Sequence, residues 1–264
     1  MKTFNRSYGV ELEIIGGINT PTGIATALRA SGIEAYQEGY NHEARPHWKL
    51  VYDGSLTGEN AIELVSPILY GEDGLKQIIT VCAVLNRLGV TVNNTCGLHV
   101  HVDARGATTR NLQNLLRTWA KYERNSSEVV APRRRDTFYA RHMFGGASLT
   151  EDWARIDRIA ERASGPMNFA YDFTGGVRYY TLNLLAFIAH GSVEFRNHGG
   201  TTDADKICNW VKLCVNTVSR SFALTGTVRP NGAGDFSDFL YGIDAKARKF
   251  FNARRQMFAG RVAA

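Results

Sequence analysis

The sequence predicts an α+β protein whose sheet is mainly antiparallel and backed by helices. Short segments alternate apolar and polar side chains with the period of two that strands show, and longer segments repeat apolar side chains every three or four positions, as amphipathic helices do. Hairpin-like and helical segments follow one another without regular strand–helix alternation, which favours the α+β class. With 264 residues, 44% of them hydrophobic, the chain can build one large domain or two small ones.

Most strands are expected in the first hundred residues. They are predicted over residues 8–15, 33–37, 47–52, 61–69 and 97–103. Thr20 and Pro21 predict the start of a short helix that ends near Ser31, because threonine caps helices and proline is tolerated at the first helical position. A turn is expected at Asp53, and apolar spacing predicts an amphipathic helix over 73–88.

Helices dominate the predictions for the rest of the chain. They are expected over residues 108–124 and 150–163, and in a long segment capped by Asp203 that runs to Phe222. Residues 126–148 are expected to form a long loop. The segments 179–188 and 192–198 are interpreted as a hairpin that turns near His190 and Gly191.

Composition and charge narrow the class of protein. The N-terminal residues lack the apolar run of a secretory signal, and no stretch reaches the roughly 18 apolar residues of a membrane span, so a cytoplasmic protein without membrane contact is expected. The cysteines lack CxxC spacing and are expected to be buried, reduced thiols; they are Cys82, Cys96, Cys208 and Cys214.

Positive charge is concentrated in two segments. Residues 245–264 hold six basic residues and no acid, and residues 105–142 hold nine basic and three acidic residues, so the remainder of the chain is net acidic. We expect a main domain over residues 1–225, followed over 226–264 by a Gly-rich connector and a basic helix packed on the same domain. A basic segment is compatible with a solvated helical face, with phosphate binding or with nucleic acid.

Three strands place acids, imidazoles and an arginine on their polar faces. Glu11 and Glu13 stand two apart, so both carboxylates leave one face, where a divalent cation would relieve their repulsion. His99 and His101 repeat that spacing, which favours a ligand or phosphate contact over two core histidines. Glu194 and Arg196 combine an acid with a guanidinium; the alternative interpretation is a cross-strand ion pair.

A further acid, Glu63, lies in an otherwise apolar strand. The sequence contains no Walker A motif, so any phosphate would be bound through metals and arginines. Neither a Gly-x-Ser-x-Gly elbow nor a marked catalytic cysteine is present.

Six of these motifs, in this order, resemble the amidoligase family of the glutamine synthetase and glutamate–cysteine ligase superfamily. The resemblance spans about residues 8–200, and its motifs are Gly9-Val-Glu-Leu-Glu13, Asp53-Gly-Ser-Leu56, Glu63-Leu-Val-Ser-Pro67, Gly97-Leu-His-Val-His101, Arg178 to Asn183, and Val193-Glu-Phe-Arg196. It implies a curved antiparallel sheet that forms a funnel, and an ATP-dependent enzyme that joins a carboxylate to an amine through an acyl phosphate.

The resemblance also implies roles for individual residues. Mg²⁺, or Mn²⁺ as an alternative, would be held by Glu11, Glu13, Glu63, His99 and Glu194. Arg196 and His101 would contact the transferred phosphoryl group. Arg178 and Asn183 would bind the carboxylate substrate or phosphate, while Arg133 and Arg134 would reach the ATP phosphates.

Two other functions stay open at the level of sequence. A metal-dependent hydrolase of amide or phosphate bonds would use the same acids and histidines without ATP. A basic nucleic-acid-binding module would use residues 105–142 and the C-terminal helix. The expected partners are small-molecule or peptide carboxylates and amines, with nucleic acid less favoured, and the sequence does not define the oligomeric state.

Overall fold

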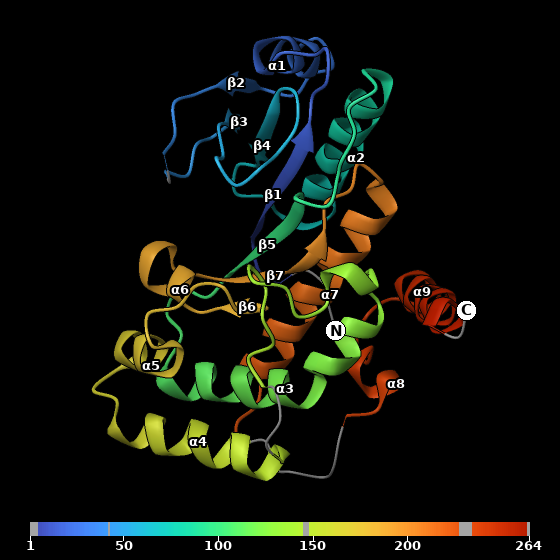
Figure 1. Ribbon diagram of the computed structural model, residues 1–264. Helices are drawn as coiled ribbons and strands as arrows, with labels where there is room; N and C mark the ends of the chain where they lie inside the picture. The colour runs from blue at the N-terminus through green and yellow to red at the C-terminus, as the bar shows by residue number, and fades with distance from the viewer. Residues whose placement is uncertain (1–4, 42, 145–147, 227–233, 263–264) are drawn as a thin grey trace. The chain divides into compact units, whose positions relative to one another are not determined.

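A computed structural model describes residues 5–41, 43–144, 148–226 and 234–262 (Figure 1). Its described part confirms the α+β class: an open, mixed sheet of seven strands has the order β2-β3-β4-β1-β5-β7-β6. The strands are β1 (Tyr8–Ile15), β2 (Ala35–Gln37), β3 (Trp48–Val51), β4 (Ala61–Val65), β5 (Gly97–Asp103), β6 (Leu182–Asn183) and β7 (Ser192–Gly199).

Helices account for most of the remaining described chain. They are α1 (Pro21–Arg29), α2 (Gly71–Arg87), α3 (Thr109–Glu128), α4 (Leu149–Arg162), α5 (Pro166–Thr174), α6 (Leu185–His190), α7 (Ala204–Phe222), α8 (Phe236–Phe239) and α9 (Ala245–Val262), with a 3-10 turn at Pro132–Arg134. Within the described ranges, no helix combines the length and apolar character that crossing a membrane requires.

The chain divides into two compact units. Unit 1 comprises residues 1–5, 101–197 and 212–264, and unit 2 comprises residues 6–100 and 198–211. The division falls inside β5, between Val100 and His101, so His99 belongs to unit 2 and His101 to unit 1. The predicted domain boundary between residues 225 and 226 stays a prediction.

Unit 2 contains β1 to β4 and most of the predicted N-terminal elements. Strands β1 and β4 are antiparallel, as are β3 and β4, whereas β2 and β3 run parallel. The predicted cap of α1 is confirmed, because Thr20 Oγ1 accepts the Gly23 N–H at 3.2 Å. Helix α1 packs on β2 and β3, and its Ile24 and Leu28 are buried. This burial anchors one face of the sheet to the core.

Unit 1 contains α3 to α6, α8 and α9. Helix α3 packs against α4, α5, α8 and α9. It continues past the predicted end at residue 124, so the expected loop over 126–148 begins later than predicted. Ser126 and Ser127 do not break the helix, because both hydroxyls donate a hydrogen bond to the Glu123 carbonyl oxygen within α3. Residues 145–147 of the expected loop lie outside the described ranges.

The predicted hairpin of residues 179–188 and 192–198 is only partly right. Strand β6 is limited to Leu182 and Asn183, which pair with β7, and the following residues form helix α6. Asn183 Oδ1 accepts the Leu185 N–H at 2.9 Å, which starts the helical turn, and Gly191 ends it in the left-handed region at φ 69°. The apolar run Leu-Ala-Phe-Ile-Ala fits a helix as well as a strand, so the spacing of apolar residues does not decide between the two structures.

The C-terminal region and the cysteines follow the predictions where the structure describes them. The basic helix exists as α9, and its Arg254 Nε donates to the Val129 carbonyl oxygen at 2.9 Å. Residues 227–233 of the expected Gly-rich connector lie outside the described ranges. All four cysteines are free and buried.

Glu123 is a buried acid whose importance is not predicted from the sequence. Its side chain is 1% exposed, yet it accepts the Met143 and Phe144 N–H groups at 2.8 and 2.9 Å and the Thr181 hydroxyl. Burial raises the pKa of Glu123, and these hydrogen bonds oppose the shift. The carboxylate therefore joins α3 to two later segments of unit 1.

Replacing Glu123 by Ala is expected to lower the free energy of unfolding by about 3–5 kcal/mol, because it leaves buried N–H groups without an acceptor. Denaturant-induced unfolding measures the change. The control is Glu161→Ala on the exposed part of α4, which is expected to change stability by at most about 0.5 kcal/mol. Equal stability of the two variants would contradict the role given to Glu123.

Candidate functional site

The candidate site of unit 2 is built on two neighbouring strands, β1 and β4. Glu13 lies directly opposite Glu63 in the antiparallel register, and Glu11 stands two residues before Glu13. Residues two apart on a strand leave the same face, and residues directly opposite each other share a face. The register therefore gathers three carboxylates on one face of the sheet, while the alternate residues Leu12 and Leu64 are buried on the other.

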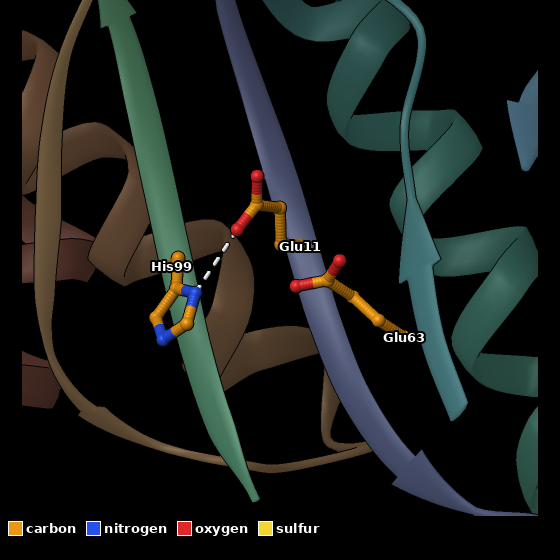
Figure 2. A group of neighbouring side chains, drawn as sticks. All are labelled: Glu11, Glu63 and His99. Carbon is orange, nitrogen blue, oxygen red and sulfur yellow. Dashed lines mark hydrogen bonds and ion pairs between the residues drawn. The ribbon is translucent and has the colours of Figure 1, made fainter. Parts of the chain in front are cut away.

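Side chains from three strands converge on this face. Figure 2 shows the Glu11 and Glu63 carboxylates and the His99 imidazole directed toward one another from β1, β4 and β5, and each offers a ligand atom within 4.8 Å of the others. The Nδ1 atom of His99 lies 3.0 Å from Glu11 Oε2. A second group, Glu13, Asp53 and Glu63, meets the same 4.8 Å limit, so Glu63 belongs to both. The predicted unit 2 metal ligands are thus brought together.

Asp53 joins the site from the predicted turn after β3. Its Oδ1 accepts the Ser55 N–H at 2.7 Å, which fixes the turn. The Asp-Gly-Ser motif is visible in the sequence, but no ligand role for Asp53 is predicted from it. The only sequence feature that could indicate a ligand role is the position of this acid in a turn directly after a buried strand. The turn lies near β4 because β3 pairs with β4, and no local sequence pattern predicts that pairing.

His99 is held between two carboxylates. Its Nε2 atom lies 3.6 Å from Glu13 Oε1, opposite the Nδ1 contact to Glu11. Glu13 also accepts a short hydrogen bond from the Gly97 N–H, and both Glu13 and His99 are nearly buried. The ring orientation is therefore fixed by the surrounding acids.

The acids of this face repel one another. The pKa of Glu63 is raised well above its ordinary value, first by burial and then by the negative charges of Glu11, Glu13 and Asp53. A raised carboxyl pKa means that the charged form is disfavoured in the fold unless a cation balances it. The face therefore favours either a proton or a bound cation.

Lys49 carries positive charge on β3, but its ammonium group is engaged elsewhere. Its Nζ donates to the Asn41 and Glu43 carbonyl oxygens at 2.9 and 2.8 Å and to Asn41 Oδ1 at 2.8 Å. Burial lowers the pKa of Lys49, and the charges of Glu38, Glu63 and Glu11 oppose that shift. Lys49 thus holds the loop before β3 through these three hydrogen bonds.

The donor set fits a hard divalent cation. Carboxylate oxygens are the protein ligands preferred by Mg²⁺ and Mn²⁺, and the clustered acids supply several of them. The imidazole of His99 is also compatible with zinc, which keeps the hydrolase interpretation chemically open. The chemistry of the donors supports metal binding in unit 2 without identifying the ion.

A second cluster lies in unit 1 and surrounds Glu194. This carboxylate is 4% exposed, accepts the Asn183 amide at 2.6 Å and forms a close ion pair with Arg196. Arg196 Nε also donates to the Tyr139 carbonyl oxygen at 3.3 Å. The guanidinium is therefore held by two acceptors on different segments, and guanidinium groups are the donors that pair most strongly with carboxylate and phosphate oxygens.

His101 lies near the same acid. Its Nε2 atom is 4.0 Å from Glu194 Oε1, and its Nδ1 atom is 3.0 Å from the Ser192 hydroxyl oxygen. The structure thus brings together four predicted residues in unit 1: Asn183, Glu194, Arg196 and His101. Their assigned roles stay predictions.

The other predicted arginines have different surroundings. Arg178 is exposed, with its guanidinium carbon 5.3 Å from the Tyr179 ring centroid. Arg133 is exposed and Arg134 is buried in the 3-10 turn. The phosphate- and substrate-binding roles predicted for these three arginines stay predictions.

The basic segment over residues 105–142 is partly neutralised inside the fold. Arg105 pairs with Asp103, Arg117 with Asp157, and Lys121 with Asp238. A continuous, uncompensated basic stripe would favour nucleic acid more strongly. The charge excess of this segment is therefore smaller on the surface than in the sequence.

Comparison with known proteins adds one match. Residues 4–218 match the model of a protein family described as "Putative amidoligase enzyme". No curated protein matches the chain significantly. The matched range includes every acid and histidine of the two clusters.

MgCl₂ or MnCl₂ is expected to raise the melting temperature of the wild-type protein, because a ligand that binds the folded state at about 100 times its Kd adds about 2.7 kcal/mol of stability. Glu63→Gln is expected to abolish this gain and to leave the metal-free protein at least as stable, since it removes a repelling charge. Differential scanning calorimetry with EDTA and with each ion measures both effects.

The matched control is Glu59→Gln, which changes an exposed acid of unit 2 and should respond to the ions like the wild type. A full metal response of the Glu63 variant would contradict the assignment.

Proposed function

The chain belongs to the amidoligase family, and from this premise we propose that it is a carbon–nitrogen ligase that uses ATP and Mg²⁺ to join a carboxylate to an amine. In the proposed reaction a carboxylate oxygen attacks the γ-phosphorus of ATP, and ADP leaves. The amine nitrogen then attacks the carbonyl carbon of the acyl phosphate, phosphate leaves and the nitrogen loses a proton. The products are an amide, ADP and phosphate.

The observation that carries this proposal is the acidic face of unit 2. Mg²⁺, or Mn²⁺ in its place, would be held by residues drawn from Glu11, Glu13, Glu63, His99 and Asp53. When bound, a divalent cation neutralises phosphate charge and so favours phosphoryl transfer. Clustered carboxylates on one face of the sheet would repel the phosphates of a nucleic acid, so this face does not favour a protein that only binds nucleic acid.

The Glu194 cluster of unit 1 supports the same chemistry. Arg196 donates charge-assisted hydrogen bonds, and its guanidinium is held by the carboxylate of Glu194 and by the Tyr139 carbonyl oxygen. We propose that Arg196 and His101 contact the phosphoryl group, and that Glu194 contributes to metal binding. Donors fixed before the reaction cost no reorganisation as charge develops.

Asn183 has two bonds that define its position. Its amide nitrogen donates to Glu194, and its Oδ1 accepts the Leu185 N–H at the start of α6. We propose that Asn183 orients the Glu194 carboxylate. The exposed Arg178 would bind the substrate carboxylate or a phosphate. The proposed substrates are small-molecule or peptide carboxylates and amines.

The wild-type protein is expected to release ADP only when Mg²⁺, an acid and an amine are all present. A coupled ADP assay against amino acids, polyamines and peptides tests this requirement. Arg196→Lys is expected to reduce turnover by about a hundredfold or more. The single ammonium group of lysine cannot replace the planar guanidinium, which contacts Glu194 and the Tyr139 carbonyl oxygen through different nitrogen atoms. Unchanged thermal stability of the variant would exclude unfolding as the reason.

Glu161→Gln on α4 is the control and should keep wild-type turnover. Hydrolysis of an amide or phosphate substrate without nucleotide would contradict the ligase and support the metal-dependent hydrolase. Full activity of Arg196→Lys would show that the guanidinium does not serve phosphoryl transfer.

A further inference from the structure

Unit 1 exposes a cluster of aromatic rings that its core does not use. Phe138 is 65% exposed and Tyr139 48% exposed. Their ring centroids lie 5.1 Å apart, and each is 5.6 Å from the half-buried ring of Tyr179. Large aromatic side chains gathered at a surface forgo the stabilisation of burial, so such a cluster points to a binding surface.

Two exposed arginines lie over these rings. The guanidinium carbon of Arg141 is 5.6 Å from the Phe138 centroid and 5.7 Å from that of Tyr180, and Arg178 is 5.3 Å from that of Tyr179. These are cation–π distances, at which the ring faces orient the guanidinium groups. Within the described ranges, Arg141 has no acidic partner in an ion pair.

The segments that carry these side chains are tied together through their backbones. The Arg141 N–H donates to the Tyr179 carbonyl oxygen at 2.8 Å, and the Thr181 N–H donates to the Arg141 carbonyl oxygen at 2.9 Å. The Tyr139 carbonyl oxygen accepts from Arg196 of the Glu194 cluster. The rings are therefore presented by a defined backbone, and little order has to be gained on binding.

We propose that Phe138, Tyr139, Tyr179, Arg141 and Arg178 form an aromatic–arginine platform that binds a nucleoside phosphate. The base stacks on the exposed ring of Phe138, and the two arginines contact the phosphates. Both halves of such a ligand find their complement here, because every base has a π-face and guanidinium groups pair with phosphate oxygens. The proposal rests on the proposed function for the identity of the ligand as ATP.

A mononucleotide fits this platform better than a single-stranded nucleic acid. Proteins that hold single strands present successive rings, each of which stacks one base. Here Phe138 meets Tyr139 edge to face at 90°, and both rings contact Tyr179, so the rings form one cluster instead of a row. Other positive charges of the basic segment 105–142 are also neutralised, because Arg117 pairs with Asp157 and Lys121 with Asp238.

The test compares three probes by isothermal titration calorimetry in Mg²⁺: ATP, inorganic tripolyphosphate and a twelve-residue oligouridylate. Phe138→Ala is expected to weaken ATP binding about tenfold and to leave tripolyphosphate binding unchanged, because only ATP carries a base. Arg141→Gln is expected to weaken both. Phe138→Trp should restore ATP binding, which a general structural defect would not allow.

The matched control is Tyr241→Ala, another exposed aromatic of unit 1 with an arginine, Arg220, at 5.0 Å from its ring. This variant is expected to bind ATP like the wild type.

ATP binding that is unaffected by Phe138→Ala would overturn the platform while leaving the ligase proposal intact. Platform-dependent ATP binding without any ADP release would support the platform and contradict the ligase. No binding of ATP would overturn both. Tighter, Phe138-dependent binding of the oligouridylate than of ATP would assign the surface to nucleic acid and overturn the mononucleotide proposal.

Discussion

The antiparallel register of β1 and β4 is the constraint on which the site of unit 2 depends. It places Glu13 opposite Glu63, with Glu11 two residues away on the same face. The register is held by the opposite face, where Leu12 and Leu64 are buried, since a slip of one residue would turn acids into the core and leucines outward. The hydrophobic core thus maintains an arrangement of like charges that the acids alone would disrupt.

Glu63, Glu123 and Glu194 are three acids of the described chain whose charges are compensated in different ways. Glu123 accepts backbone N–H groups and a hydroxyl, and Glu194 pairs with Arg196 and an amide. Glu63 differs, because its nearest charged neighbours are other carboxylates and its pKa is raised accordingly. Glu123 and Glu194 are satisfied by the protein itself, whereas Glu63 is the acid for which a cation has the most to contribute.

The alternation of apolar and polar residues predicted which strand faces carry most of the candidate site residues. The period-two alternation placed Glu11 and Glu13 on one face, and the structure confirms strand β1 over the predicted residues. The same reasoning failed at α6, where an apolar run was assigned to a strand although Asn183 starts a helical turn. Asp53 and Glu123 were not recognised as functional or structural acids, because their importance comes from contacts between segments far apart in the sequence. The periodicity of apolar residues shows which face of a strand or helix a side chain occupies, whereas the contacts between such faces depend on tertiary packing.

Diffraction from Mn²⁺-soaked crystals, collected at the manganese absorption edge, shows directly whether the acidic face of β1 and β4 binds a metal ion. We expect an anomalous peak within bonding distance of carboxylate oxygens of Glu63 and of Glu11 or Glu13, and we expect this peak to be lost in crystals of Glu63→Gln. A peak that persists in that variant, or manganese bound only at acids outside this face, would contradict the claim that β1 and β4 build a metal centre.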